Sequence, residues 1–207
     1  IGIDLDKRKV DLSLELGADH AFVRSESNST AILELTNHVG ADSVIITASG
    51  DSNDSIELSG KITRKKAIIS IIGDIKLDIP RENFYKKELS VQIPSSYGPG
   101  RYDRNYEEHG HDYPVGFVRW TISRNMHTAL QLMKEKKLTP SKIITEMFSI
   151  DSAIQSYSDL DNSTKLRIGS VIKYDENQSN VNSKIISVKK MEPSPNKINC
   201  GLIGGGI

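Results

Sequence analysis

Short apolar runs alternate with amphipathic stretches along the first half of the chain. The apolar runs predict β-strands because branched residues dominate them, and apolar residues at helical spacing predict helices between them. The predicted strands are 1–6, 20–23, 43–47, 67–72 and 89–93, and the predicted helices are 7–16, 30–38 and a stretch from caps at 51–54 to about 64. Repeated strand, helix and strand order is typical of a parallel sheet with crossover helices, so the pattern predicts an α/β fold.

The second half changes in character at residue 95. Residues 95–120 are rich in glycine, proline and aromatic residues, which is typical of an ordered functional loop or an interface segment. A helix over 125–136 is predicted with Met126, Leu130 and Met133 on one stripe. A second helix is predicted from the Asp151 cap, with Ile154 and Tyr157 facing inward. A strand at 169–174, a linker over 175–197 with one short strand at 184–188, and a last strand from 198 into the terminal glycines complete the prediction.

Composition narrows the class of function. The 207 residues carry 27 lysine and arginine residues and 27 aspartate and glutamate residues, so net charge gives no argument for nucleic acid or an anionic membrane as partner. No apolar run approaches the roughly 20 residues that a membrane-spanning helix needs. The single cysteine, Cys200, can neither form a disulfide within the chain nor supply a zinc site alone. A cytoplasmic setting is therefore expected.

Both ends of the chain carry parts of a dinucleotide-binding pattern. Asp4 ends the first strand, where a carboxylate can accept hydrogen bonds from both ribose hydroxyls of an adenosine. At the other end, Gly204 and Gly206 match the first two glycines of G-x-G-x-x-G. The glycine turn that belongs with Asp4 is then expected upstream of residue 1, and the chain is interpreted as an internal piece of a larger polypeptide. A solvent-facing acid that begins the next helix is the other interpretation of Asp4.

Three further residues follow predicted strands. Ala48, Ser49 and Gly73 come after the strands 43–47 and 67–72, at the edge where an open α/β sheet binds its ligand. They are candidate cofactor-binding residues. The alternative is that they are ordinary loop residues suited to a tight turn.

Several segments resemble known oxidoreductases. Residues 3–9, 15–19, 40–45 and 71–73 resemble the coenzyme domain of medium-chain dehydrogenases of the zinc alcohol and threonine dehydrogenase type, and 136–157 resembles the segment that returns to the catalytic domain of that family. The motifs Gly-Pro-Gly-Arg-Tyr-Asp at 98–103, Tyr-Pro-Val-Gly-Phe-Val-Arg-Trp at 113–120 and Arg-Asn-Met at 124–126 are similar to two-domain oxidoreductases. In those proteins the dehydrogenase is fused to a Gfo/Idh/MocA-type domain, the glucose-fructose oxidoreductase or inositol dehydrogenase type.

The resemblance implies a fold and a division of the chain. It implies an incomplete doubly wound parallel (Rossmann-type) sheet, the carboxyl-terminal return segment of a medium-chain dehydrogenase, and the first strand of a second Rossmann domain. The corresponding segments are 1–94 for the partial NAD-binding domain, 95–174 for the loop and return segment, 175–197 for the linker and 198–207 for the start of the second domain.

The resemblance also implies roles for individual residues. It gives Asp4 and Lys9 to the adenosine ribose, and the acid implies NAD rather than NADP; a surface lysine is the alternative for Lys9. The family's catalytic zinc would be bound in the intact protein by residues that these 207 do not contain. His109 and His111 make a poor metal site without a cysteine or a convergent carboxylate. Arg101, Arg119 and Arg124 are candidates for anion contacts or for salt bridges to nearby acids.

The leading hypothesis is a nicotinamide-dependent oxidoreductase that transfers hydride to or from an alcohol or sugar-like substrate when intact. The 207-residue fragment itself, with no catalytic residue assigned, is expected to be inactive. A homo-oligomer pairing through 89–93 is expected by analogy with related dehydrogenases. The alternative is a non-catalytic, dehydrogenase-shaped scaffold or interaction module with 95–120 as its working surface.

Overall fold

The computed structural model describes residues 1–158 and 166–174. Its strands are β1 (Gly2–Asp4), β2 (Ala21–Val23), β3 (Ala41–Ile46), β4 (Thr63–Ile71), β5 (Ser90–Gln92), β6 (Ile144–Ser149) and β7 (Gly169–Lys173). Its α-helices are α1 (Lys7–Glu15), α2 (Asn28–Leu35), α3 (Asp54–Ile62), α4 (Arg81–Lys87), α5 (Arg104–Glu107), α6 (Ile122–Lys134) and α7 (Ala153–Ser158). Short 3-10 turns η1 (Pro140–Lys142) and η2 (Ile150–Ser152) flank β6.

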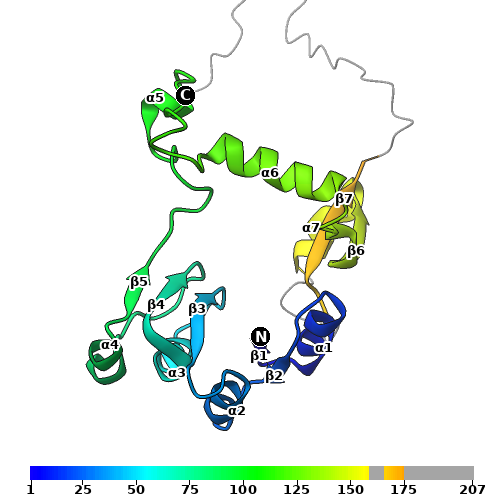
Figure 1. The fold of residues 1–207 in the computed structure, drawn as a ribbon. Helices are drawn as coiled ribbons and strands as arrows, with labels where there is room; N and C mark the ends of the chain where they lie inside the picture. The colour runs from blue at the N-terminus through cyan, green and yellow to red at the C-terminus, as the bar shows by residue number, and fades with distance from the viewer. Residues whose placement is uncertain (159–165, 175–207) are drawn as a thin grey trace, which may run out of the picture.

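Every strand pair in the described residues is parallel. The strands form a two-stranded sheet β1-β2, a three-stranded sheet β3-β4-β5 and a two-stranded sheet β6-β7 (Figure 1). The helices α1, α3 and α4 are the crossovers that these paired parallel strands require, and α2 connects β2 to β3 of the next sheet. This is the α/β architecture that the alternating pattern predicts.

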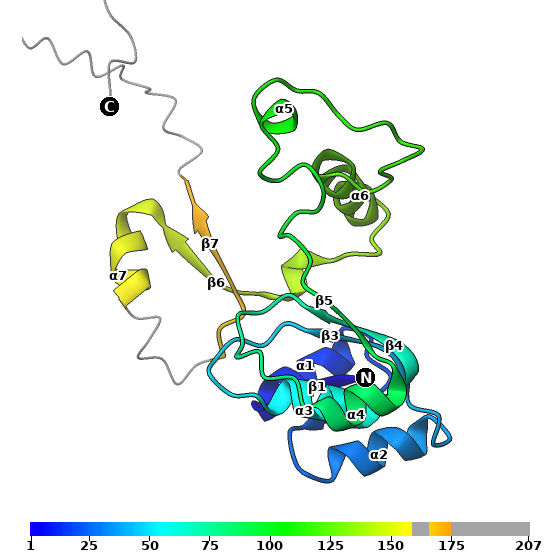
Figure 2. The ribbon, with the colours of Figure 1, turned by 90° about the vertical axis from the view of Figure 1, so that its left-hand side faces the viewer.

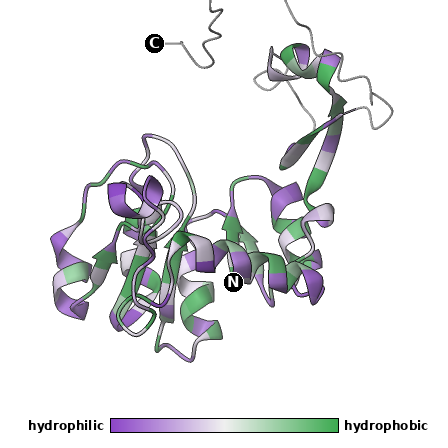
Figure 3. Cartoon of the chain, turned by 90° about the horizontal axis from the view of Figure 1, so that it is seen from above, coloured by the Kyte–Doolittle hydropathy of each residue, from purple (hydrophilic) through white to green (hydrophobic). Residues whose placement is uncertain are grey.

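The main core lies under the three-stranded sheet. Ile46, Ile69 and Ile71 of β3 and β4 pack against Ile56 of α3 and Phe84 of α4. Burial of these five large apolar side chains contributes about 1.5–3 kcal/mol each to the stability of this region. The helices show alternating apolar and polar residues (Figure 3), as expected where one side of a helix is buried.

The opposite face of the same sheet is open. Ile45 and Ile68 point away from α3 and α4, and their side chains are 65% and 42% exposed. Central strands of a parallel sheet are normally covered on both faces. The described residues therefore cover only one face of β3 and β4.

A second core joins the two sheets. Ile32 of α2 packs with Leu58 and Ile62 of α3, and this cluster contacts Ile3 and Phe22 from the first sheet and Val44 from the second. The sheets β1-β2 and β3-β4-β5 therefore rest on one layer of helices. In Figure 1, β1 and β3 are the neighbouring strands across the space between the sheets.

Some boundaries and elements differ from the sequence predictions. α3 ends at Ile62 and β4 begins at Thr63, earlier than the predicted strand at 67. Lys87 explains this early end, because its ammonium group donates hydrogen bonds to the last carbonyls of α3 and takes over the role of a helix cap. The helices α4 and α5 and the strand β6 were not predicted.

The predicted inward side of the later helices is wrong. Ile154 and Tyr157 of α7 are 85% and 69% exposed. Met126, Leu130 and Met133 lie on α6 as predicted, but all three side chains are exposed, since nothing in the described residues covers that stripe. Figures 1 and 2 show α6 away from the sheets β1-β2 and β3-β4-β5 in both views.

Several predictions fall outside the described residues. They concern the linker 175–197 with its short strand 184–188, Cys200, the glycines Gly204 and Gly206, and the second domain predicted from 198. Among the described helices, none is long and apolar enough to cross a bilayer.

We expect Lys87 to stabilise the junction of α3 and β4. Its Nζ lies 2.8 Å from the carbonyl oxygens of Gly60 and Lys61 and 2.7 Å from that of Thr63, and burial lowers its pKa. Replacement by methionine should reduce the free energy of unfolding by about 1.5–3 kcal/mol, because the carbonyls lose a charged donor. Urea unfolding measures this.

Lys86 provides the matched control. It forms an ion pair with the exposed Glu82 one helical turn away, so Lys86→Met should change the free energy of unfolding by less than about 0.5 kcal/mol. Equal effects of the two substitutions would contradict the capping role of Lys87.

Candidate functional site

Asp4 and Lys9 meet at the carboxyl end of β1. Asp4 is the last residue of β1, and Lys9 lies in the first turn of α1. The Lys9 ammonium nitrogen lies 3.9 Å from Oδ2 of Asp4, and both side chains are about half exposed. A carboxylate and an ammonium group are thus available to the same small polar ligand.

The turn from β1 into α1 holds the Asp4 carboxylate in place. The backbone N–H of Asp6 donates to Oδ1 of Asp4 at 2.9 Å, which leaves Oδ2 directed to Lys9. Asp6 itself caps α1 by accepting a hydrogen bond from the backbone N–H of Arg8. Hydrogen bonds from the Arg8 side chain and backbone lower the pKa of Asp6 to about 2. The helix start therefore stays charged and capped at neutral pH.

The carboxyl ends of β3 and β4 pack closely against each other. Ile72 and Gly73 both donate backbone hydrogen bonds to the carbonyl of Ile46, at 2.8 and 3.0 Å. A Cβ atom added to Gly73 would lie 1.8 Å from the carbonyl oxygen of Ala48. Only glycine fits there, so Gly73 fixes how near the loop after β4 comes to the loop after β3.

Arg24 links the two sheets at this same edge. It follows β2, and its guanidinium binds both carboxylate oxygens of Asp54, the first residue of α3, with Nε 2.6 Å from Oδ2. The hydrogen bond from Arg24 lowers the pKa of Asp54. Because Arg24 follows β2 and Asp54 follows β3, the carboxyl ends of strands from both sheets lie at one edge. Open α/β sheets bind ligands at this edge.

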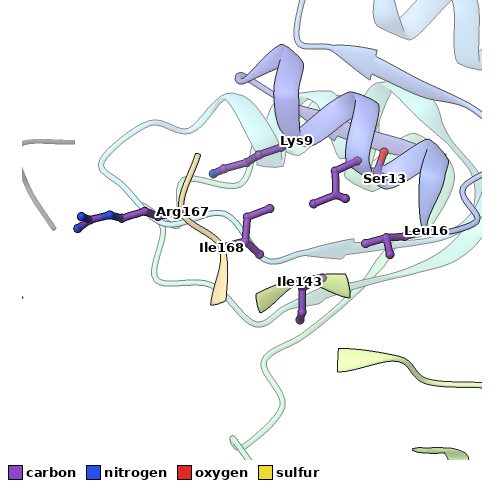
Figure 4. A pocket seen from close by; sticks show the side chains of 7 residues that line it. Lys9, Ser13, Leu16, Ile143, Arg167 and Ile168 are labelled. Atoms are coloured by element: carbon purple, nitrogen blue, oxygen red, sulfur yellow. The ribbon is translucent and has the colours of Figure 1, made fainter. Parts of the chain in front are cut away.

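One cavity lies next to this edge. It has a volume of about 330 Å³ and is open to solvent. It lies between Lys9 and Leu12 of α1, Leu16 just after that helix, and Ile143 and Ile168, which directly precede β6 and β7 (Figure 4). In Figure 4 the Lys9 side chain extends along it toward Ile168. The cavity therefore offers an apolar wall beside the Asp4 and Lys9 pair.

A second cavity lies at the other end of the strands. It has a volume of about 450 Å³, and its lining includes Val39 before β3, Thr63 at the start of β4, and the basic residues Lys61 and Arg64. Ligands of open α/β sheets bind at the carboxyl ends of the strands, so this amino-terminal cavity is a poor candidate for a coenzyme.

The predicted site residues form two groups. Asp4 and Lys9 lie together on one side, and Ala48 and Gly73 are in contact on the other. Ser49 is exposed in the loop after β3. No described contact joins the two groups, because β1 and β3 do not pair with each other.

The three loop arginines, Arg101, Arg119 and Arg124, make two kinds of contact. Arg101 and Arg124 form ion pairs with Glu107 and Asp112, at 2.6 and 2.7 Å. Arg119 instead lies over the ring of Trp120, 4.4 Å from its centroid. Two of the three arginines are therefore engaged in local salt bridges.

The described residues do not fit a zinc ion. Nowhere in residues 1–158 and 166–174 do three or more histidine, cysteine, aspartate or glutamate side chains gather closely enough to hold a metal. The rings of His109 and His111 lie 6.2 Å apart, edge to face, and His109 contacts Asn105. No chemical step is assigned to a metal held by this part of the chain.

Comparison with protein families identifies the fold. The family model for the zinc-binding dehydrogenases matches residues 1–108, which include all of α1 to α4 and β1 to β5. The chain belongs to the zinc-binding dehydrogenase family. None of the curated proteins compared with it matches the chain.

Solved structures show the same fold at low sequence identity. The 2R,3R-butanediol dehydrogenase of Bacillus subtilis matches 84% of the chain with a TM-score of 0.62 and 16% identity. The galactitol-1-phosphate dehydrogenase of Escherichia coli matches 80% with a TM-score of 0.59 and 19% identity. A structure from E. coli CFT073 described as a short chain alcohol dehydrogenase, complexed with NADH, matches 81% with a TM-score of 0.57 and 15% identity.

The chain spans less than half of these dehydrogenases. It covers 43% of the first two and 42% of the third. The family and the parallel α/β fold are therefore established, while the match to these structures shows the fold alone.

Sequence reasoning missed the Arg24–Asp54 pair. The two residues are 30 positions apart, so no local pattern connects them. The one available signal was positional, because Arg24 directly follows a predicted strand and Asp54 lies in a predicted cap region.

We expect Gly73 to tolerate no side chain. Gly73→Ala would force the Ala48 loop away and should lower the free energy of unfolding by about 1–3 kcal/mol. Gly116 is the matched control, since no atom lies within 4 Å of an added Cβ there. Gly116→Ala should change stability by less than about 0.5 kcal/mol in the same urea titration. A tolerated Gly73→Ala would show that the two loops are not held together.

Proposed function

We propose that the chain is the coenzyme-binding part of a nicotinamide-dependent oxidoreductase that acts on an alcohol or sugar-like substrate when intact. The observation that carries the proposal is the Asp4 carboxylate at the carboxyl end of β1, oriented by the N–H of Asp6 and close to Lys9. Membership of the zinc-binding dehydrogenase family supports it.

Asp4 favours NAD over NADP. Its Oδ1 accepts from the backbone, and its Oδ2 can accept from a ribose hydroxyl, while a 2′-phosphate at the same position would meet a like charge. Lys9 is near enough to donate to a ribose oxygen from the other side. The dehydrogenase structure solved with NADH has the same fold, which is consistent with this choice.

Ala48, Ser49 and Gly73 are proposed to contact the coenzyme across the edge from Asp4. The tight contact of Gly73 with Ala48 holds the two loops close together at the ends of β3 and β4. When bound, the nicotinamide accepts or supplies the hydride; the residues of this chain would bind and orient the coenzyme.

The remaining parts of the proposal concern the intact protein. Any zinc of the intact protein is proposed to be bound by residues that these 207 do not contain, as the family resemblance implies; the described part of the chain, 1–158 and 166–174, brings no three candidate ligand side chains together. Alcohols and polyol phosphates appear in the names of the matched dehydrogenases, which favours a substrate of that class. Fusion to a Gfo/Idh/MocA-type domain and pairing of subunits through β5 remain predictions from the sequence.

A second candidate is a non-catalytic scaffold with 95–120 as its contact surface. The observation that favours it is the ordered loop around α5, in which Tyr106 stacks on Tyr113 and donates to Ser123 while Phe117 is 90% exposed. Exposed aromatic side chains are common in contact surfaces. A scaffold would need no coenzyme, so coenzyme binding separates the two candidates.

We expect NAD to bind the intact protein, with the glycine turn expected upstream of residue 1, in a way that depends on Asp4. Titration followed by NMR should shift signals at the carboxyl ends of β1 and β3, and Asp4→Ala should weaken binding about 10- to 100-fold, because a charged acceptor for the ribose hydroxyls is lost. Asp11→Ala is the control, since Asp11 is exposed on α1 and pairs with Lys7. Absence of NAD-induced shifts, or equal effects of the two substitutions, would favour the scaffold.

A further inference from the structure

The second cavity, at the amino-terminal ends of β3 and β4, is strongly basic. Its volume of about 450 Å³ is within the usual range for sites that bind small ligands. The turn after α2, the last turn of α3, the start of β4 and the helix α4 line it. Four of its nine lining residues are Lys61, Arg64, Lys65 and Lys87, and no carboxylate is among the nine. We call it the basic cavity.

A bulge in β4 places two of these cations at the basic cavity. Residues 64–67 of β4 stand opposite the single residue Asp42 of β3. A strand with extra residues bends out of the ladder at that point, and Arg64 and Lys65 of the bulge line the cavity. Lys66 has a φ of 59° and is the one non-glycine residue within a described strand that is left-handed. Strained residues of this kind cluster at ligand sites, whereas glycine adopts the same conformation without strain.

The lysines of the basic cavity have no acid partner. Lys66, which does not line the cavity, pairs with Glu88 at 3.3 Å. In the part of the chain that the structure describes, no ion pair includes Lys61, Lys65 or Lys87. The side chains of Lys61 and Lys65 are exposed, and that of Lys87 is half-buried. Three positive charges without a carboxylate partner therefore surround one cavity.

Arg64 and Asn83 add hydrogen-bond donors to the lining. Nε of Arg64 donates to Oδ1 of Asp42 at 2.6 Å, and its Nη1 donates to the carbonyl of Lys65 at 2.9 Å. Within residues 1–158 and 166–174, neither Nη2 of Arg64 nor the side-chain amide of Asn83 has a hydrogen-bond partner. Both side chains are half-buried. The cavity therefore combines positive charge with unused donors.

Lys87 connects the basic cavity to the end of α3. Its ammonium group donates to the carbonyls of Gly60, Lys61 and Thr63, and its side chain is part of the lining. Burial lowers the pKa of Lys87, and a nearby anion stabilises the charged form of a lysine. An anion in the cavity would therefore reinforce the group that ends α3.

We propose that the basic cavity binds a small molecule that carries phosphate groups. Lysine ammonium groups and the arginine fork are the side chains that bind phosphate oxygens best. Leu33 and Val39, on the α2 side of the cavity, provide an apolar surface for the carbon part of such a ligand. The cavity lies at the opposite end of the strands from Asp4. The site is therefore separate from the proposed coenzyme site and does not depend on it.

Lysine acetylation of the intact protein, with pyrophosphate as the probe, tests the site directly. At constant ionic strength, pyrophosphate should slow the acetylation of Lys61 and Lys65 about fivefold or more, measured by peptide mass spectrometry. Lys66 and Lys86 are controls within the same protein, because they lie outside the lining and already have acid partners. Their rates should change less than twofold. No protection, or equal protection of all four lysines, would overturn the proposal.

The same measurement separates the basic cavity from the coenzyme site, whose own phosphate-binding turn could take up pyrophosphate. Lys9 reports on the coenzyme site. Protection of Lys9 without protection of Lys61 and Lys65 would place the probe there and overturn the proposal. Protection of Lys61 and Lys65 that persists with excess NAD would support it, whether or not NAD itself binds.

A matched pair of variants measures the contribution of one lysine. In calorimetric titrations with pyrophosphate and excess NAD, Lys65→Ala should weaken binding about fivefold or more, because a charged donor is lost. Lys86→Ala removes the same charge from the exposed side of α4 and should change the affinity less than twofold. Equal effects of the two substitutions would show attraction by overall charge and would overturn the site.

A single-stranded oligonucleotide separates a small-molecule site from a surface for nucleic acid. Its phosphates contact any exposed cation along an extended path, whereas the basic cavity is enclosed by α2, α3 and α4. If the oligonucleotide protects Lys61, Lys65, Lys66 and Lys86 alike and pyrophosphate protects none of them, the small-molecule site is wrong. Protection by pyrophosphate confined to Lys61 and Lys65 would support it.

Discussion

The structure depends on one apolar contact, the packing of Ile32 of α2 against Leu58 and Ile62 of α3. Ile3 and Val44 reach this cluster from separate sheets, and no hydrogen bond between strands joins those sheets in the described residues. Burial of these side chains, at about 1.5–3 kcal/mol each, therefore holds the two sheets together, as hydrogen bonds between strands do within each sheet. The cluster holds the ends of β1 and β3 at one edge, where the candidate site lies.

An ion pair adds direction to this apolar contact. Hydrophobic contacts fix distance but tolerate sliding, whereas the two-pronged geometry of Arg24 on Asp54 fixes how α3 is oriented relative to β2. Both residues are partly exposed, so solvent reduces the energy of the pair, and its contribution is mainly geometric. The carboxylate of Asp4 and the loops after β3 and β4 are positioned by these two interactions together.

Local pattern predicted the parts of the fold that local chemistry determines. Runs such as Val44 to Ile46 predict strands, and an acid at the end of the first strand predicts Asp4 at the edge. The helix α4 was missed because Phe84 is its one buried residue, so it shows no apolar period. The inward positions of Ile154 and Tyr157 were wrong because periodicity identifies an apolar side without showing whether anything covers it.

In the candidate site as well, sequence spacing determines some contacts and tertiary packing determines others. Asp4 ends β1 and Lys9 lies in the first turn of α1, so their short separation in sequence is enough to bring the two side chains together. Gly73 and Ala48, or Arg24 and Asp54, meet only because two sheets share one helical layer, which no spacing reveals.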